Sequence, residues 1–409
     1  MDKMKNISTI ADCYGCGVCA TACPKNIIHM RLNADGFYQS YIDEEHKCIN
    51  CSLCLKVCSY IQESLSTPHE VRQSYASWSN ERAVRRKSSS GGTGFEIARY
   101  LMQQGYEVLG VRYNAELNRA EHYIATTVEE LIQSMGSKYI QSYTVDAFKQ
   151  LEGKKKYLIT GSPCQIDSIR RYIKHLKIEE NFILMDFFCH GVPSQLVWNK
   201  YLAEVEKTTG KVVSASWRNK YTDWHDSWCM DIDGEDPKKK VDWHDSYNLL
   251  IKGEGTPYSS RYSQGDAFYR LFLCDSCLGK ACYDKCKYKY RSSSADIRIG
   301  DLWGKKYREN EEGVTGVVVY TEKGKEALKH CNCRLIPEPF EIVAAGQMKT
   351  PAQRGRIYER LWELLRDENS SIYQLSMIVN NDLRRRRNID RLKHPLRTFI
   401  NIAKRIIKK

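Results

Sequence analysis

The sequence predicts an α/β protein in which a small, cysteine-rich α+β module is fused to a larger α/β body. A cysteine-rich motif occurs twice in the first 62 residues, on either side of a hairpin pattern. From residue 73 onward, segments typical of strands and of helices alternate. A chain of 409 residues that is 42% hydrophobic can bury cores for about two or three domains.

Composition narrows the classes of protein to which this chain can belong. The N-terminus lacks a signal-peptide pattern and no apolar run reaches the length of a membrane span, so we expect a cytoplasmic protein. In that compartment, 17 cysteines are better explained by metal binding or redox chemistry than by disulfides. The net charge is +13, and residues 384–409, with 11 Lys or Arg against one Asp, carry +10 of it. The chain is therefore a nearly neutral body with a basic tail.

The first 62 residues contain two copies of one cysteine motif. CYGCGVCATACP starts at Cys13, and CINCSLCLKVCS repeats its spacing 35 residues later. Three closely spaced thiolates can hold three irons of a cubane, while the fourth points toward the other cluster. We therefore predict two interleaved [4Fe–4S] clusters, held by Cys13, Cys16, Cys19 and Cys58, and by Cys48, Cys51, Cys54 and Cys23. The alternative, a pair of structural zinc sites, rarely uses such tight tandem spacing.

Residues 1–62 resemble a bacterial two-cluster ferredoxin, except that Ser59 stands where the first copy has Pro24. Between the copies, IIHMRLNADGFYQSYID predicts two strands joined at Asp35-Gly36, and residues 63–72 predict a linker. A ferredoxin module performs no bond chemistry, so its electrons need a destination in the rest of the chain.

The body, predicted over residues 73–345, opens with a strand (SYASWS), a helical turn (ERAVRRK) and the loop SSSGGTG. A helix (EIARYLMQQG) and a strand (YEVLGVRY) follow. A Ser- and Gly-rich loop that opens a helix can hold an anion, such as the phosphate of a dinucleotide cofactor. The loop does not match G-x-G-x-x-G, and an ordinary N-cap with a flexible loop explains the stretch equally well.

Two further cysteines follow consecutive predicted strands. YLIT leads to Cys164 at the start of a helix, where the helix dipole favours a thiolate, and FILMDFF leads to Cys189. If the strands are parallel neighbours, both thiols lie at the carboxyl edge of the sheet, where α/β proteins place their sites. Taken separately, each thiol could be an ordinary buried core residue.

A third group of cysteines follows in CDSCLGKACYDKC, namely Cys274, Cys277, Cys282 and Cys286. Alone, it would also fit a four-cysteine zinc site. Together with Cys164 and Cys189 it favours a shared metal site. The remaining cysteines, Cys229, Cys331 and Cys333, have no such pattern around them.

SSSGGTG, TGSPCQ, FFCHGVPS and ADIRIGD, in this order behind a two-cluster ferredoxin, resemble the beta-subunit family of coenzyme F-420 (deazaflavin) hydrogenases and dehydrogenases over residues 5–305. The resemblance implies a flavin-dependent iron–sulfur oxidoreductase with FAD and a third [4Fe–4S] cluster in the body. It places FAD near Ser88, Ser89, Ser90, Gly91, Gly92, Thr93, Gly300 and Asp301. It makes Cys164, Cys189, Cys282 and Cys286 the leading ligands of the third cluster. The motifs identify no catalytic residue.

The last pair of ligands departs from the family pattern. The family usually has a two-residue gap there, whereas three residues separate Cys282 from Cys286. Cys274 and Cys277 keep the two-residue gap. The last two ligands therefore remain open among these four cysteines.

The C-terminal part predicts one more strand (VTGVVVY), a helix (EKGKEALKH), a helical segment over residues 346–383 that includes 350–366, and a basic tail over residues 384–409. In PLRTFINIAKRIIKK most apolar residues share one helical face and the basic residues lie off it. This pattern is typical of a helix in a membrane interface. Docking on the chain itself or on a protein partner is the alternative. A nucleic-acid role lacks an aromatic-interleaved basic surface.

From these observations we expect an iron–sulfur flavoprotein oxidoreductase. It would pass electrons between a ferredoxin-type donor or acceptor and a small-molecule, two-electron substrate, through [4Fe–4S] clusters and FAD. The alternatives are a non-catalytic electron-transfer subunit of a larger redox complex and a zinc-stabilised scaffold. The basic tail adds an anionic membrane surface as a partner, which would place a cytoplasmic protein at the inner face of the membrane. No nucleic-acid partner is expected.

Overall fold

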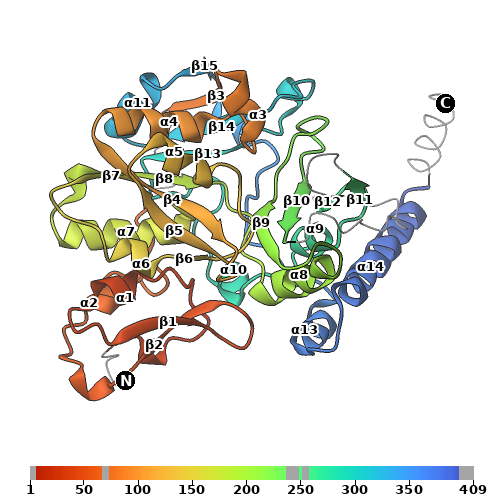
Figure 1. The fold of residues 1–409 in the computed structure, drawn as a ribbon, viewed down its shortest axis with the longest axis horizontal. Coiled ribbons are helices and arrows are strands. Elements are labelled where there is room, and N and C mark those ends of the chain that lie inside the picture. Colours follow the sequence, from red (N-terminus) through yellow and green to blue (C-terminus); the bar gives the residue numbers. More distant parts are fainter. Residues whose placement is uncertain (1–5, 67–72, 236–247, 251–257, 396–409) are drawn as a thin grey trace.

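The computed structural model describes residues 6–66, 73–235, 248–250 and 258–395. The described chain forms two-, four- and nine-stranded sheets with helices around them, as Figure 1 shows. The predicted α/β fold class is confirmed, with a small N-terminal α+β part beside a larger α/β part.

The N-terminal part is a hairpin with short helices that carry the cysteine motifs. The hairpin strands pair antiparallel from Ile28↔Ile42 to Leu32↔Tyr38, as the sequence predicts. Gly36 lies in the turn with φ of +74°, a backbone conformation that favours glycine. The elements are η1 (Ile7–Thr9), α1 (Val18–Ala22), β1 (Ile28–Leu32), β2 (Tyr38–Ile42), η2 (Glu45–Lys47) and α2 (Leu53–Lys56).

The nine-stranded sheet has the order β15-β3-β14-β13-β8-β7-β4-β5-β6. Its centre, β13-β8-β7-β4, is parallel, and most of the outer pairs are antiparallel. The strands are β3 (Gln73–Ser79), β4 (Tyr106–Asn114), β5 (Arg119–Ala125), β6 (Ser142–Tyr143), β7 (Lys156–Thr160), β8 (Phe182–Phe187), β13 (Ile297–Asp301), β14 (Thr315–Val319) and β15 (Cys333–Pro337). The strands before Cys164 and Cys189 are therefore parallel neighbours, as the sequence argument required.

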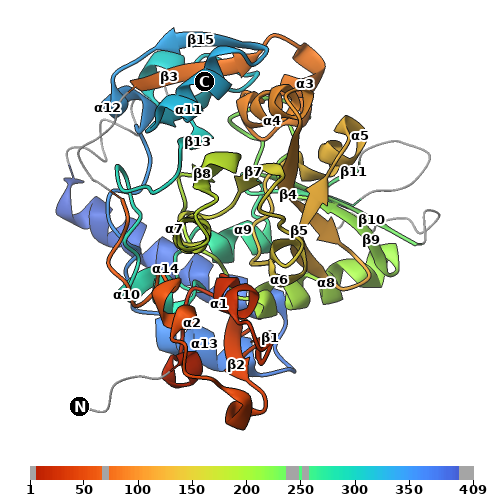
Figure 2. The same cartoon turned by 90° about the vertical axis from the view of Figure 1, so that its left-hand side faces the viewer.

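Helices cover both faces of this sheet. Because side chains alternate along a strand, Leu158 of β7 packs with α4 and α11, while Tyr157 and Ile159 pack with α6 and α7. Val18 of α1 joins the second of these cores, so the N-terminal module packs against the α7 side (Figure 2). The helices of this part are α3 (Arg82–Lys87), α4 (Thr93–Gln103), α5 (Val128–Leu131), η3 (Ile132–Ser134), α6 (Val145–Phe148), α7 (Pro163–His175), η4 (Glu179–Asn181), η5 (Lys305–Tyr307), α11 (Glu322–Lys329) and α12 (Phe340–Val343).

The remaining elements build a third core beside the sheet. Trp198, Trp217, Phe268, Trp362 and Leu375 are fully or almost fully buried in it. The antiparallel sheet β11-β12-β10-β9 forms one side. The elements are α8 (Gln195–Thr209), β9 (Val212–Ser216), β10 (Cys229–Gly234), β11 (Asn248–Leu250), β12 (Tyr258–Arg261), α9 (Ala267–Phe272), α10 (Lys280–Asp284), α13 (Tyr358–Arg366) and α14 (Ile372–Lys393).

The C-terminal helices differ from the sequence prediction in two ways. Residues 350–357 contain no helix, because α13 begins only at Tyr358. α14 runs without a break through residue 384, where we expected the basic tail to begin. Buried Asp382 explains this continuity, since its carboxylate pairs with Arg356 at 3.0 Å and with Arg386, one turn further, at 2.6 Å. The predicted amphipathic segment over 396–409 lies outside the described residues.

No helix in the described part of the chain is both long and apolar enough to cross a bilayer.

The ADIRIGD motif ties the central strands together. Arg298 of β13 and Asp186 of β8 are register partners and fully buried, and two hydrogen bonds of 2.7 Å join their side chains. The carboxylate of Asp296 accepts the backbone N–H of Leu184 at 2.7 Å. Charges buried this deeply are costly unless they are paired and hydrogen-bonded, so the first part of the motif serves the sheet. The last two residues, Gly300 and Asp301, face a cavity.

Candidate functional site

The structure brings the eight N-terminal cysteines together as two groups. Cys13, Cys16 and Cys19 lie close enough to Cys58 for all four thiols to interact electrostatically. Burial raises the pKa of Cys16 to about 12. A thiol buried in this way favours its deprotonated form only when a cation compensates the charge, as iron does. The donor set therefore fits the first predicted cluster.

The second group lies at the molecular surface. Cys23, Cys48, Cys51 and Cys54 line one small hollow of about 20 Å³. Cys51 is exposed, whereas Cys54 is buried. The exposed edge would let an external electron carrier approach this group closely. Within the described residues, no three His, Cys, Asp or Glu side chains converge as closely as the ligands of a single metal ion do.

The cysteine loops need left-handed backbone at equivalent positions, but the two copies achieve it differently. Gly15 and Gly17 have φ of +66° and +73°, and Asn50 and Ser52, 35 residues later, have φ of +53° and +57°. A Cβ on Gly15 would lie 2.3 Å from Gln141 Nε2, and one on Gly17 would lie 2.2 Å from Thr144 Oγ1. The first copy requires glycine because it packs against the body.

A third group of thiols forms in the body. Cys164 is the second residue of α7, shortly after β7, Cys189 follows β8, and Cys282 lies in α10. Cys164 interacts electrostatically with Cys189 and Cys282, and Cys286 interacts with both Cys189 and Cys282. Four thiols from three separate segments thus lie near one another, and this donor set fits a third cluster.

The expectation that the helix dipole favours a thiolate at Cys164 is wrong for the protein without metal. Burial raises the pKa of this thiol well above its usual range, and the neighbouring thiols of Cys189 and Cys282 raise it further. Desolvation by the surrounding protein outweighs the dipole of α7. A bound cation would be needed to deprotonate it at neutral pH.

A cavity of about 590 Å³ adjoins this third group. Its volume lies within the range of about 300–1,000 Å³ that is common for cofactor and ligand pockets. Cys164, Cys189 and Cys282 line it, and so does Cys13 of the N-terminal module. The cavity therefore touches two of the three thiol groups and both parts of the chain.

Most residues that we expected near FAD line this cavity, namely Ser88, Ser89, Ser90, Gly92, Gly300 and Asp301. Gly91 and Thr93 do not line the cavity and form hydrogen bonds to strands of the sheet instead. The Gly91 N–H donates to Thr315 Oγ1 at 2.9 Å, and the Thr93 hydroxyl donates to Ser77 Oγ at 2.8 Å. These two residues hold the loop in place.

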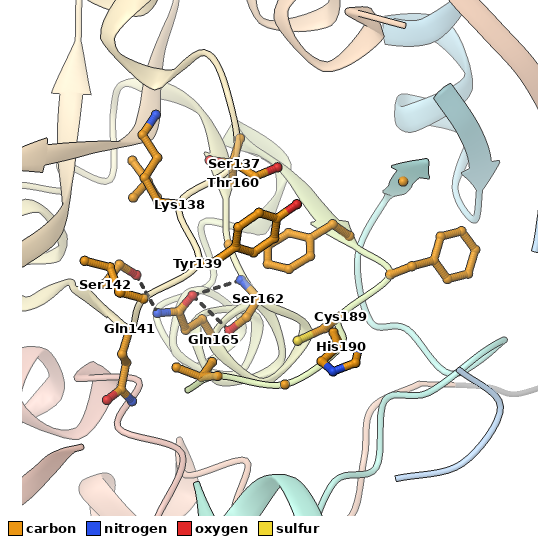
Figure 3. Close-up of a pocket in the computed structure, with 18 of the residues that line it drawn as sticks. Ser137, Lys138, Tyr139, Gln141, Ser142, Thr160, Ser162, Gln165, Cys189 and His190 are labelled. Atoms are coloured by element: carbon orange, nitrogen blue, oxygen red, sulfur yellow. Dashed lines mark hydrogen bonds between the residues drawn. The ribbon is translucent and has the colours of Figure 1, made fainter. Parts of the chain in front are cut away.

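Sequence reasoning missed the segment GSKYIQS, residues 136–142, which forms one wall of the cavity. Its Ser137 donates its backbone N–H to Ser89 Oγ at 2.8 Å. The Tyr139 hydroxyl accepts a hydrogen bond from Arg218 Nη1 at 3.1 Å, and Figure 3 shows that Lys138 points away from Tyr139. The Lys138 ammonium donates to the backbone carbonyl of Met135 at 2.9 Å. The Gly136-Ser137 pair and Tyr139 could have indicated this wall of the cavity, but they match no motif that we used.

Gln165 joins two segments that line the same cavity. Its Oε1 accepts the Ser162 N–H at 2.9 Å, and its amide donates to Ser142 Oγ at 3.1 Å (Figure 3). The first of these bonds belongs to the capping box of α7. The start of the helix that carries Cys164 is thereby bound to the GSKYIQS segment.

Arg218 is the second residue that the sequence did not reveal. Its side chain is fully buried, and its guanidinium donates to Asp301 Oδ2 at 2.7 Å and to the carbonyl of Ser89 at 3.2 Å. It lies over the rings of Trp228 and Trp303, at 4.6 and 5.6 Å from their centroids. One cation therefore joins the Ser-Gly loop to the Gly-Asp wall.

Ser59 explains why the second cysteine copy lacks a proline. Its N–H donates to Ser168 Oγ at 3.1 Å, and its hydroxyl donates to the carbonyl of Cys164 at 3.0 Å. The Cys16 thiol also contacts Ser168 Oγ, at 3.3 Å. Proline has no N–H, so serine at this position lets the first thiol group dock on α7.

We expect Ser59→Pro to loosen this docking, because it removes both hydrogen bonds and leaves Ser168 and the Cys164 carbonyl buried without these donors. The cost should be about 1–3 kcal/mol. Hydrogen–deuterium exchange at the start of α7 measures it. Ser59→Ala, which keeps the N–H, should show a smaller increase in exchange. Equal exchange in the two variants would contradict the role given to the N–H.

The fold and the thiol groups define an iron–sulfur protein with a fused two-cluster module. Residues 12–61 match the family model of a 4Fe-4S dicluster domain, and residues 47–91 match a second model of that description. Residues 74–149 match the N-terminal model, and residues 154–336 the C-terminal model, of the family described as "Coenzyme F420 hydrogenase/dehydrogenase, beta subunit". The chain belongs to this beta-subunit family.

Two curated proteins are similar to parts of the chain. The coenzyme F420-dependent sulfite reductase of Methanocaldococcus jannaschii is 24% identical over 177 residues, 41% of this chain and 26% of that protein. The coenzyme F420 hydrogenase subunit beta of Methanococcus voltae is 35% identical over 72 residues, 16% of this chain and 26% of that protein. The chain thus matches about a quarter of the length of each relative.

Among solved structures, a chain of the F420-reducing [NiFe] hydrogenase complex from Methanosarcina barkeri covers 76% of this chain, and 92% of that chain is matched. The TM-score is 0.43 and the identity 14%, a similarity too weak to support an inference.

Proposed function

We propose that the protein is an iron–sulfur flavoprotein oxidoreductase that passes electrons between a ferredoxin-type carrier and a two-electron substrate. The observation that carries the proposal is the cavity, because thiols of two groups, the Ser-Gly loop and the Gly-Asp wall all line it. Flavins exchange one electron or two, which is the chemistry that such a cavity would need beside one-electron clusters.

The residues of the chain have distinct roles in this proposal. Cys164, Cys189, Cys282 and Cys286 would hold the third [4Fe–4S] cluster, since each of these thiols interacts with at least two of the others, Cys164 with Cys189 and Cys282. Ser88–Ser90 and Gly92 would hold FAD from one side and Gly300 and Asp301 from the other. Arg218 positions both walls. Phe188, Trp228 and Trp303 also line the cavity and would keep water from it.

The proposed substrate is a small molecule, and the names of the relatives make the deazaflavin F420 the first candidate to test. The alternative is a non-catalytic electron-transfer subunit. The name of the Methanococcus voltae relative, a hydrogenase subunit, and the exposed Cys51 favour a chain that docks on a redox partner.

Cofactor content tests the proposal. Anaerobically reconstituted protein should contain about 12 irons per chain, as three cubanes require, together with one FAD. Iron, zinc and flavin analysis measure this. About 8 irons would remove the third cluster, and zinc in place of iron would support the scaffold. Full iron without flavin, and no turnover of reduced F420 without a partner, would favour the electron-transfer subunit.

We also propose that the basic C-terminus contacts an anionic membrane surface. Each Lys or Arg near such a surface contributes about 1 kcal/mol, and salt should weaken the attraction over a Debye length of about 8 Å. A chain that ends at Pro395 keeps the whole of α14 and the ion pairs of Asp382. It should co-sediment less with anionic vesicles and keep its iron, because it loses five of the eleven basic residues of 384–409. Equal sedimentation of full-length and shortened chains would exclude residues 396–409 as a membrane anchor.

A further inference from the structure

Three tyrosine rings meet between the first thiol group and the third. The rings belong to Tyr14, Tyr60 and Tyr288, which follow the predicted ligands Cys13, Cys58 and Cys286 by one or two residues. The ring of Tyr14 lies edge-on to the other two, with its centroid 5.3 Å from that of Tyr60 and 6.1 Å from that of Tyr288. Two of the rings therefore come from the N-terminal module and the third from the body.

Hydrogen bonds hold Tyr14 on the body at both of its ends. Its backbone carbonyl accepts a hydrogen bond from Gln141 Nε2 at 3.0 Å. Its hydroxyl donates to the backbone carbonyl of Lys285, the residue directly before Cys286. Because Cys13 directly precedes Tyr14, this one residue connects a ligand of the first group to the neighbour of a ligand of the third group.

A further contact fixes the other two rings. The Lys287 ammonium donates to the backbone carbonyls of Ser59 and Tyr60, at 3.0 and 3.2 Å. Lys287 stands directly before Tyr288, so the segment after Cys286 is bound to the end of the N-terminal module. The three rings keep their places because the segments that carry them are joined to one another.

The rings also lie at the wall of the cavity. Tyr14 and Tyr288 line it, together with Cys13 of the first thiol group and with Cys164 and Cys282 of the third. The two thiol groups thus reach one cavity, and the tyrosines stand between them.

We propose that Tyr14 is the bridge through which electrons pass between the first cluster and the third, and that the rings of Tyr60 and Tyr288 keep this contact closely packed. The inference rests on the proposed function, because it requires both clusters. It adds the residue that connects them.

The route through Tyr14 crosses a single non-covalent contact. From Cys13 it follows one peptide bond to Tyr14, and from the Tyr14 hydroxyl it follows one hydrogen bond to the carbonyl of Lys285, which is bonded to Cys286. Electron tunnelling weakens far more steeply across empty space than across covalent bonds and closely packed atoms, and protein interiors are packed with few voids. A filled, hydrogen-bonded contact between the two ligand sets is therefore the favourable path.

Each transfer moves one electron and no proton. One cluster is oxidised by one electron while the other is reduced by one, and two transfers supply the two electrons that a flavin takes up. Tyr14 itself is neither oxidised nor deprotonated. Burial raises the pKa of its phenol well above the usual range, so the phenol keeps its proton and its hydrogen bond to the Lys285 carbonyl.

The test follows the reduction of the third cluster in anaerobic, full-length protein with about 12 irons per chain. A light flash reduces an external ferredoxin, and freeze-quenched electron paramagnetic resonance records how fast electrons move from the N-terminal clusters to the third. Cys164→Ala, which should lack the third signal, assigns it. A third signal that is missing from the unmodified protein would contradict the proposed function before any Tyr14 variant is made, so the two failures are distinguishable.

Substitutions of Tyr14 measure its role. Tyr14→Leu removes the ring and the hydrogen bond and should slow this transfer several-fold, while the iron content and the midpoint potentials of the clusters stay unchanged. Tyr14→Phe loses only the hydrogen bond, and its rate should lie between the two. The matched control is Tyr41→Leu, because Tyr41 is a partly buried tyrosine of β2 whose ring contacts His29 of the same hairpin. This control should transfer electrons at the rate of the unmodified protein.

Equal rates in Tyr14→Leu and Tyr41→Leu would overturn the proposal. Slower transfer together with shifted midpoint potentials would also overturn it, since Tyr14 would then act on the potentials of the clusters and not as the bridge. If Tyr14→Leu loses iron, Tyr14→Phe takes its place, because it keeps the packed ring. A rate in Tyr14→Phe equal to that of the unmodified protein would then exclude the hydrogen-bonded route.

Discussion

Replacing Cys164 by alanine should lower the iron content from about 12 to about 8 atoms per chain, because a cubane without one of its four thiolates is lost from this buried site. Alanine is preferred to serine, whose oxygen can still bind iron. The two N-terminal groups should remain, since Cys164 is only a neighbour of Cys16 there. Iron analysis and the electron paramagnetic resonance of the reduced protein measure both outcomes.

The matched control is Cys333→Ala. Cys333 is also partly buried, but it lies at the start of the edge strand β15, whereas Cys164 follows the central strand β7. This variant should keep about 12 irons. If Cys164→Ala keeps the same iron as the control, Cys164 is a structural thiol and the third cluster has other ligands.

Arg218→Met should destabilise the protein by about 3 kcal/mol or more and reduce its flavin content. The substitution leaves Asp301, whose side chain is only 14% exposed, without its cation. It also removes the donors that join the Ser89 carbonyl to Asp301. The unfolding free energy from urea titration and the flavin absorbance of the purified protein measure the two effects.

A substitution of the same kind on an exposed helix is the control. Arg384 lies on the exposed part of α14, and Arg384→Met should change the unfolding free energy by less than about 0.5 kcal/mol. A variant Arg218→Met that unfolds like Arg384→Met would show that the buried pair is not needed. Normal stability together with loss of the flavin would show that Arg218 acts on cofactor binding and not on the stability of the fold.

Local patterns in the sequence were sufficient wherever a short stretch of chain decides its own geometry. The hairpin around Gly36 and the strands before Cys164 and Cys189 formed as predicted, because turn chemistry and apolar runs act over a few residues. The helices over 346–383 were placed less well. α14 extends past residue 384 because ion pairs of Asp382 with residues on both sides stabilise it, and no local stop signal opposes it.

The candidate site was harder to predict from the sequence. The first copy of the cysteine motif uses glycine where the second uses Asn50 and Ser52, and only the approach of Gln141 and Thr144 explains why. Arg218 gave no sequence signal, because a single buried cation between two loops belongs to no motif. The pKa of Cys164 has the opposite direction from the one inferred from its helix position, since burial is a property of the whole fold.

By itself, the sequence determined the two consecutive cysteine repeats, the α/β class and the family, because each follows from residue types at fixed short spacings. Only the tertiary structure decided which of the later cysteines lie together. Cys282 and Cys286 lie beside Cys164 and Cys189, while Cys274 and Cys277 interact with each other. The physical reason is that thiols from three separate segments meet only where β7, β8 and α10 converge, and spacing along the chain does not encode that distance.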